Sequence, residues 1–248
     1  MASNIITSID IGTSKISILV CNVSSNENIE ILGIGTSVLK GVQRGIIQDP
    51  RQFSNSFQNC LKRAEITSQE TISDVFINVP NGNKRFAIET GVHQNHDSQI
   101  VSKKAIECAM KKATHCIEKK NQSILHLLPI NQRVDGHSIQ QNIKSPFTHL
   151  EIDTGIICCD TTNLNTVIQQ AKANNLKIKG IISDYFSIGA IASKVKSNNV
   201  LVVDFGAQLT SFCLFNRGKL KFAKTIHIGS ELITNDLSIC LKCSFSEA

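Results

Sequence analysis

The chain of 248 residues contains no tryptophan and a single tyrosine, and its eleven phenylalanines are scattered. It also lacks a strong charge of one sign, since 26 Lys and Arg stand against 20 Asp and Glu. Proteins dedicated to nucleic acid usually concentrate basic residues and interleave aromatic ones that stack on bases. We therefore expect no nucleic-acid partner.

Long apolar runs are missing as well. No stretch approaches the roughly 20 apolar residues that cross a bilayer, and the first residues lack the basic start and apolar core of a signal peptide. The nine cysteines lie mostly in apolar runs, which is typical of free thiols in a reducing compartment. The single Cys-x-x-Cys, at 240–243, has no second pair and is not read as a metal or redox site. With 41% hydrophobic residues, the chain is predicted to be folded, soluble and cytoplasmic.

A strand–turn–strand–turn–strand pattern occurs twice. In the first copy, residues 5–39, the first turn follows Asp10 and contains Gly12. In the second copy, residues 200–228, the corresponding turn follows Asp204 and contains Gly206. Two such copies predict two related domains that face each other.

Between the two copies, segments with the apolar spacing of a helix alternate with short apolar runs typical of strands. Asp49-Pro50 is a typical helix start, because Asp caps and proline suits the first helical position. Helical spacing of apolar residues predicts three helices, and apolar runs predict four strands. The helices are expected at 50–64, 102–117 and 163–175, and the strands at 74–79, 123–133, 149–159 and, buried, 178–182. This order indicates a mixed α/β architecture, with residues 81–157 as an inserted β-rich subdomain with one helix.

The Asp-x-Gly turns carry the predicted chemistry. A tight turn with glycine lets backbone N–H groups converge on an anion. Asp10 and Asp204 at the strand ends suit a hydrated Mg²⁺, which uses few protein ligands. Thr13, Ser14 and Lys15 add hydroxyls and a positive charge. Facing each other, the two turns would hold the terminal phosphates of a nucleotide and its metal.

The residues of both turns resemble known loops. Ile9-Asp10-Ile11-Gly12-Thr13-Ser14-Lys15 and Val202-Val203-Asp204-Phe205-Gly206 are similar to the two phosphate loops of the actin, heat-shock-chaperone and sugar-kinase superfamily. Within it, the chain resembles the FtsA family of bacterial cell-division proteins, from about Ile6 to the last residue. Further stretches carry the resemblance at 33–35, 40–49, 64–65, 124–129, 134–136, 143–146 and 228–236.

This resemblance implies a fold class and a division into domains. The implied fold is α/β, the actin-like ATPase (ribonuclease H-like) fold, with an inserted α+β subdomain of the SHS2 type. The first actin-like domain would take 1–80 and 158–197, and the SHS2 subdomain 81–157. Residues 198–248 would begin a second actin-like domain that is incomplete here, so we expect a fragment or a truncated product.

The resemblance also implies a site for ATP and Mg²⁺. The N–H groups of Gly12, Thr13 and Ser14, with Lys15, would hold the β-phosphate. Gly206 and Thr210 would face the γ-phosphate, and Gly229 would complete the nucleotide site. Asp10 and Asp204 would orient Mg²⁺ through water.

The second loop departs from the family pattern. Where the family has Asp-x-Gly-Gly-Gly-Thr-x-Asp, this chain has Ala207, Gln208, Leu209 and Ser211. Side chains are thus expected where backbone should approach phosphate, which puts ATP affinity or hydrolysis in question. Ser183-Asp184 replaces a Glu-Pro that often positions water. No catalytic residue is assigned, and at most a slow ATPase is expected.

The implied function is an ATP-binding scaffold of cell division. FtsA proteins polymerise and tether the tubulin-like protein FtsZ to the cytoplasmic face of the inner membrane, and they recruit later division proteins. Their membrane contact is a C-terminal helix that is absent from this chain. Two alternatives stay open: a PilM-like pilus-assembly scaffold, which the Asp-x-Gly-Ala-x-x-Thr form of the second loop favours, and a phosphotransferase of the sugar-kinase type.

Overall fold

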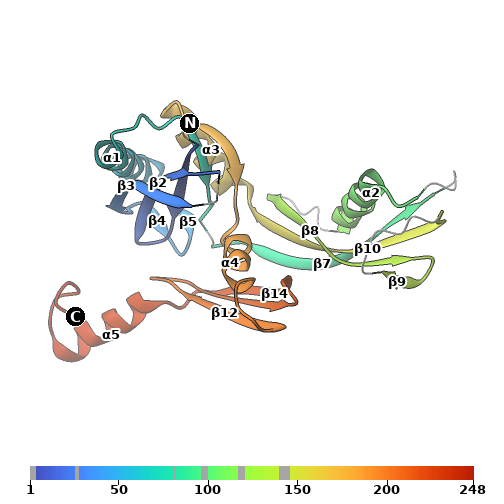
Figure 1. Cartoon of the computed structure of the whole chain (residues 1–248). Helices are drawn as coiled ribbons and strands as arrows, with labels where there is room; N and C mark the ends of the chain where they lie inside the picture. The colour runs from blue at the N-terminus through green and yellow to red at the C-terminus, as the bar shows by residue number, and fades with distance from the viewer. Residues whose placement is uncertain (1–3, 26–27, 81, 96–99, 117–120, 140–145) are drawn as a thin grey trace.

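The computed structural model describes residues 4–25, 28–80, 82–95, 100–116, 121–139 and 146–248 (Figure 1). Most strands of these residues belong to three larger sheets. A five-stranded sheet with its helices stands at one end, a four-stranded sheet extends away from it, and a three-stranded sheet lies below both (Figure 1). The part of the chain that the structure describes contains no helix long and apolar enough to span a membrane.

The first sheet has the strand order β11-β6-β1-β2-β3. Strands β1, β2 and β3 form an antiparallel meander. Strand β6 pairs parallel with β1, and β11 pairs parallel with β6. The bounds are β1 Ile5–Ile11, β2 Lys15–Val23, β3 Ile29–Val38, β6 Asp74–Ile77 and β11 Lys177–Ile181. Alternation along β2 buries Ile16, Ile18 and Val20 completely, so one face of this sheet is core.

Two helices cover that core. Helix α1, Pro50–Ser68, starts as predicted, because the Asp49 side chain accepts hydrogen bonds from the backbone N–H groups of Arg51 and Gln52. Its buried residues and those of α3, Thr161–Ala173, belong to one apolar cluster with the strands. The helical spacing of apolar residues predicted for 50–64 is confirmed, because the buried apolar residues of α1 are Phe53, Phe57, Cys60, Leu61 and Ala64.

A small hairpin links β3 to α1. It consists of β4, Val42–Gln43, and β5, Ile46–Ile47. The turn residues between them, Arg44 and Gly45, both have positive φ, 49° and 70°. This pair of left-handed residues is the combination that joins two antiparallel strands by a two-residue turn.

The four-stranded sheet, in the order β7-β10-β8-β9, is antiparallel throughout. Helix α2, Lys103–Ala113, packs against β7 and β10 and buries Ala105, Ala109, Met110 and Ala113. A short 3-10 helix, Thr114–Cys116, follows α2. The strands are β7 Arg85–Gln94, β8 Gln122–Val134, β9 His137–Ile139 and β10 His149–Asp160. The described part of residues 81–157 thus consists mainly of strands with one α-helix, while its assignment as an inserted SHS2 subdomain stays a prediction.

The three-stranded sheet repeats the opening meander. It consists of β12, Asn199–Phe205, β13, Thr210–Asn216, and β14, Lys219–Ile226. One face packs on helix α4, Asp184–Ala192. The other face exposes several large apolar side chains, and helix α5, Ser230–Leu241, has no buried residue. Those exposed side chains are Leu201, Val203, Phe205, Leu214 and Phe222.

Some predicted bounds are wrong. The strand expected at 74–79 ends at Ile77, and the helix expected to reach 117 ends at Ala113, beyond which Ile117 lies outside the described residues. The strand expected to be buried at 178–182 is β11, and its residues are only partly buried or exposed. It is an edge strand of the first sheet, so only one of its neighbours is a strand.

Candidate functional site

The two Asp-x-Gly turns have the same backbone geometry. In the first, the N–H of Gly12 donates to the carbonyl oxygen of Lys15 at 3.0 Å. In the second, the N–H of Gly206 donates to the carbonyl oxygen of Leu209 at 2.9 Å. Asp10 pairs with Ser17 across its hairpin as Asp204 pairs with Ser211. The turns therefore correspond residue by residue, and Leu209 stands in the second where Lys15 stands in the first.

Both turns open onto one cavity of about 370 Å³. The sequence predicted that they face each other across a cleft, and this arrangement is present. The cavity also receives side chains from the loop after β6 and from the start of α4. Its lining residues are Asp10, Ile11, Gly12, Thr13, Ser14, Lys15, Asn78, Val79, Asp184, Asp204, Phe205, Gly206, Ala207, Leu209 and Ser211.

Two expected site residues do not line this cavity. Thr210 is buried, and its hydroxyl donates to the carbonyl oxygen of Ile228 at 2.6 Å. The cause is strand alternation, because Ser211, the next residue, points into the cavity. Gly229 lies behind the second turn, so close that an added Cβ would come within 2.6 Å of the backbone nitrogen of Gln208. Thr210 thus packs inward and Gly229 supports the turn, and neither lies among the residues that line the cavity.

The expectation for Gln208 also needs correction. Its side chain is not among those that line the cavity. It instead accepts a hydrogen bond from the backbone N–H of Arg44 and donates one to the carboxylate of Glu231. Ala207 and Leu209 do line the cavity. Ala207 stands where the family pattern has a glycine and Leu209 where it has a threonine, so both narrow the approach of a phosphate.

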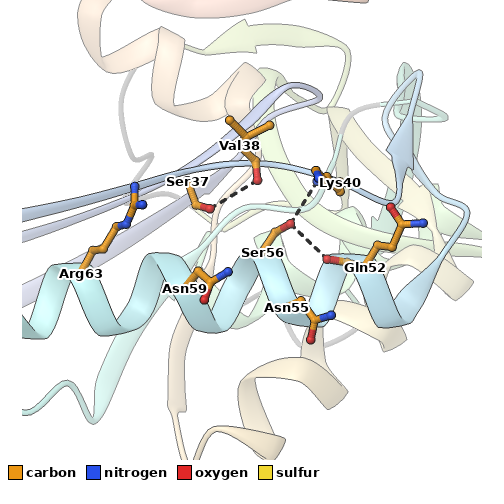
Figure 2. A pocket seen from close by; sticks show the side chains of 8 residues that line it. All are labelled: Ser37, Val38, Lys40, Gln52, Asn55, Ser56, Asn59 and Arg63. Atoms are coloured by element: carbon orange, nitrogen blue, oxygen red, sulfur yellow. Dashed lines mark hydrogen bonds between the residues drawn. The ribbon is translucent and has the colours of Figure 1, made fainter.

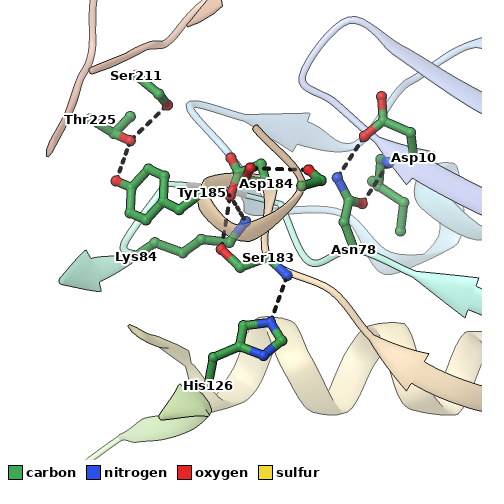
Figure 3. A network of polar contacts seen from close by, with 11 residues as sticks. Asp10, Asn78, Lys84, His126, Ser183, Asp184, Tyr185, Ser211 and Thr225 are labelled. Carbon is green, nitrogen blue, oxygen red and sulfur yellow. Dashed lines mark hydrogen bonds and ion pairs between the residues drawn. The ribbon is translucent and has the colours of Figure 1, made fainter. Parts of the chain in front are cut away.

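Asp10 is held in place by an amide from a neighbouring strand's end. The Nδ2 of Asn78 donates to Oδ1 of Asp10 at 2.6 Å, and Oδ1 of Asn78 accepts from the backbone N–H of Ile11 at 2.7 Å (Figure 3). The carboxylate opens onto the cavity but has protein around it. Burial, and next the charges of Asp184 and Asp204, raise the pKa of Asp10, while Lys84 and Lys15 oppose the rise.

Lys84 and Asp184 form a buried ion pair beside the cavity. The Nζ of Lys84 lies 2.6 Å from Oδ1 of Asp184, and 1% of the Lys84 side chain is exposed (Figure 3). Desolvation and the charge of Asp184 raise the pKa of Asp204, and Lys84 lowers it. Lys84 is thus the buried cation among three carboxylates, and the sequence pattern did not single it out.

Polar contacts continue from α4 to both neighbouring sheets. The backbone N–H of Ser183 donates to Nε2 of His126 (Figure 3). The His126 ring stacks on Phe186. Burial lowers the pKa of His126, and Lys84 adds to this shift. The Tyr185 hydroxyl shares a hydrogen bond of 2.6 Å with Thr225 of β14. The start of α4, and with it Asp184, is therefore fixed from two sides.

The charges suit a phosphate ligand that brings a cation. Asp10, Asp184 and Asp204 face the cavity, against Lys15 at its edge and Lys84 behind it. Burial, and after it the charges of neighbouring carboxylates, raise the pKa of Asp10 and Asp204, and a hydrated divalent cation would offset both effects. Within the described ranges, no three His, Cys, Asp or Glu residues gather as direct ligands. The predicted contact of Mg²⁺ through water stays a prediction.

A second hollow, of about 530 Å³, lies between β3 and α1 (Figure 2). Its side chains are mostly uncharged amides and hydroxyls. Ser56 is already used, since its hydroxyl donates to the carbonyl oxygen of Gln52 and accepts from the N–H of Lys40. No carboxylate lines it. Although it is larger, it offers neither paired acids nor convergent backbone N–H groups, and the cavity between the turns remains the candidate site.

Comparisons with known proteins agree with the resemblance to FtsA. A family model described as "Cell division protein FtsA" matches residues 201–248. FtsA of Buchnera aphidicola subsp. Acyrthosiphon pisum is 25% identical over 98% of this chain and 59% of its own length. FtsA of Borreliella burgdorferi is 25% identical over 96% of this chain, again across 59% of its length. The chain therefore resembles FtsA proteins almost from end to end, and it spans about three-fifths of these relatives.

Solved structures confirm the fold. A PilM-PilN type IV pilus biogenesis complex matches with a TM-score of 0.69 at 12% identity, over 98% of this chain and 67% of the other. The ethanolamine utilization protein EutJ of Carboxydothermus hydrogenoformans matches with a TM-score of 0.55 at 12% identity, over 100% of this chain and 60% of the other. The chain has the α/β actin-like ATPase fold. At 12% sequence identity, these structural similarities show the fold alone.

Proposed function

We propose that this chain is the nucleotide-binding part of an FtsA-type scaffold of bacterial cell division. The observation that carries the proposal is the pair of equivalent turns facing one cavity, each with an aspartate at its strand end. Similarity to FtsA proteins along nearly the whole chain gives the biological setting.

The ligand would be ATP with Mg²⁺. The N–H groups of Gly12, Thr13 and Ser14 would hold the β-phosphate, because a turn with glycine leaves its backbone donors open. Lys15 would add a positive charge there, and Asp10 and Asp204 would hold Mg²⁺ through its water shell. When bound, the metal would offset the phosphate charge and the repulsion between the carboxylates.

Binding without fast turnover fits the second turn. Ala207 lines the cavity where the family pattern has a glycine that would let a backbone donor approach a γ-phosphate, and Leu209 lines it in place of a threonine. Asp184 lines the cavity but is engaged by Lys84, so it is not free to act as a base toward water. A slow ATPase at most is proposed, with the bound nucleotide used for assembly.

The wider role follows from the FtsA relatives. We propose self-association into polymers, FtsZ and later division proteins as partners, and action at the cytoplasmic face of the inner membrane. The domain division proposed is 1–80 with 158–197, the insertion 81–157 as an SHS2-type subdomain, and 198–248 as the start of the second actin-like domain. Contacts to neighbouring subunits or later division proteins are assigned to the insertion.

The site is tested by Mg²⁺-dependent binding of a fluorescent ATP analogue to the purified chain. Asp10→Asn and Asp204→Asn should each weaken the affinity about tenfold or more, because a charge-assisted contact is lost. Asp236→Asn is the matched control, since Asp236 is exposed on α5 and should bind as the parent does. Unchanged affinity in both site variants would refute the site.

The role is tested by depleting the protein in its own cells. Undivided, elongated cells support the division role, and normal division with loss of pili supports the PilM-like alternative, which the second turn's Asp-x-Gly-Ala-x-x-Thr sequence favours. Transfer of phosphate from ATP to a sugar by the purified chain would instead support a phosphotransferase. Normal division with intact pili would contradict both scaffold roles.

A further inference from the structure

The side chain of Gln208 connects three parts of the molecule. Its Oε1 accepts a hydrogen bond of 2.6 Å from the backbone N–H of Arg44, which lies 164 positions earlier in the β4–β5 hairpin. Its Nε2 donates to Oε2 of Glu231 in the first turn of α5 at 2.8 Å. One amide thus joins the second Asp-x-Gly turn to the hairpin and to the helix that follows its sheet.

The hairpin end of this connection is rigid. Asn163 of α3 is 3% exposed, and its amide holds both sides of the hairpin. Its Oδ1 accepts from the N–H of Ile47 at 3.1 Å, and its Nδ2 donates to the carbonyl oxygen of Gly45 at 2.9 Å. Gly45 also leaves room for its neighbours, because an added Cβ would meet Leu209 Cδ1 at 2.9 Å. The Arg44 N–H is therefore presented from a fixed position on the first domain.

The helix end is equally tied to the turn. The N–H of Ser230 donates to the carbonyl oxygen of Gly206 at 3.0 Å, and that of Glu231 to the carbonyl oxygen of Ala207 at 2.8 Å. These bonds use the free N–H groups of the first turn of α5, which lack partners within the helix. The turn at 206–209 and the start of α5 consequently move as one unit, and Gln208 is its polar contact to the hairpin.

We propose that Gln208 is a positioning residue that fixes the second turn against the β4–β5 hairpin without any bound phosphate. In a turn made of glycines, no side chain could make these contacts, and the ligand would have to order the loop. Here the side chain of Gln208 orders the loop, because a half-buried amide whose donor and acceptor are both hydrogen-bonded resists displacement. The cavity between the two turns is thus set at its width before a ligand arrives. This inference concerns the ligand-free chain and does not depend on ATP being the ligand.

The test is hydrogen–deuterium exchange of the ligand-free full chain, read in peptides that cover 42–47 and 206–209. Gln208→Ala should speed exchange about tenfold in both segments, because the two segments lose the bonds that hold them together. Gln43→Ala is the matched control, since Gln43 is an exposed amide on the same hairpin. It should leave both segments as they are in the parent.

A swapped pair separates positioning from a general structural effect. Gln208→Glu alone keeps an acceptor for the Arg44 N–H but sets two carboxylates against each other, so exchange should rise. Adding Glu231→Gln to Gln208→Glu restores a donor opposite an acceptor and should return exchange to the parent rate. The inference is overturned if Gln208→Ala leaves both segments at the parent rate, or if the swapped pair exchanges as fast as Gln208→Glu. Exchange that becomes slow only after Mg²⁺ and the ATP analogue are added to the parent chain would also overturn it, while supporting the nucleotide site.

Discussion

The Nζ of Lys84 lies 2.6 Å from Oδ1 of Asp184, with Lys84 almost fully enclosed at 1% exposure of its side chain. Lys84 precedes β7 and Asp184 begins α4, so the pair connects the four-stranded sheet to the edge of the cavity between the turns. A buried charge that loses its partner is costly, whereas loss of both charges can be nearly neutral.

This pair should behave non-additively. Lys84→Met or Asp184→Asn alone should lower the free energy of unfolding by about 2–4 kcal/mol, because each leaves the other charge without its direct partner. The double variant should lose about 1–2 kcal/mol less than the sum of the two single variants. Urea unfolding at pH 7 measures all three, and additive losses would mean that the two side chains do not interact.

Binding of Mg²⁺ with the nucleotide should weaken on mild acidification. The pKa values of Asp10 and Asp204 are raised above the ordinary 3.8, mainly by burial and the charge of Asp184. Because the metal needs the deprotonated carboxylates, protons begin to compete at a higher pH than for ordinary aspartates. Affinity for the ATP analogue, titrated between pH 7.5 and 4.5, should therefore fall as the pH decreases.

The matched measurement uses Lys84→Met. Lys84 lowers the pKa of both aspartates, so its removal should move the decline in affinity to a still higher pH. A decline in affinity that begins at the same pH in Lys84→Met as in the parent chain would contradict the assigned electrostatics.

The facing turns could be predicted from the sequence because each turn has a recognisable local pattern of residues. Asp10 and Asp204 each follow an apolar strand and precede a glycine, and the repetition of that pattern indicated two equivalent sites. Lys84 could not be found in this way, since it meets its partner only through the fold, 100 positions along the chain. The direction of Gln208 was missed for the same reason, because its bond to Arg44 depends on how the hairpin is placed.

The predicted fold class is confirmed, whereas burial was predicted less well. An apolar run such as 178–182 reads as a buried strand, but β11 lies at a sheet edge with its residues only partly covered. Strand alternation also explains why Thr210 does not line the cavity, because neighbouring residues of a strand face opposite sides. Which side is core depends on the elements that pack there, and the sequence pattern alone does not specify them.

Gly35 should be intolerant of any side chain. It lies in β3 directly under α1, and an added Cβ would overlap the carbonyl oxygen of Cys60 and come within 2.6 Å of the backbone nitrogen of Ala64. Backbone atoms cannot rotate away, so Gly35→Ala should reduce the free energy of unfolding by about 3 kcal/mol. Gly180→Ala is the control, because its Cβ would meet only the ring of Phe76, at 3.0 Å. Equal losses in the two variants would show that helix and strand separate easily.

Acid stability of the four-stranded sheet should depend on Asp153. Both terminal nitrogens of Arg133 donate to its carboxylate, at 2.9 and 3.0 Å, and hold the pKa of Asp153 at about 2. Because this pKa is lower in the folded chain than the ordinary 3.8, the contribution of Asp153 to the free energy of unfolding is complete above the unfolded pKa and is lost as the pH falls through about 2.

Asp153→Asn should therefore lower the free energy of unfolding by about 1–2 kcal/mol at pH 7. Urea unfolding should show the difference from the parent falling to about half at pH 3, whereas Glu107→Gln on the exposed face of α2 should show little difference at either pH. A gap that stays constant from pH 7 to pH 3 would mean that Asp153 acts by shape and not by charge.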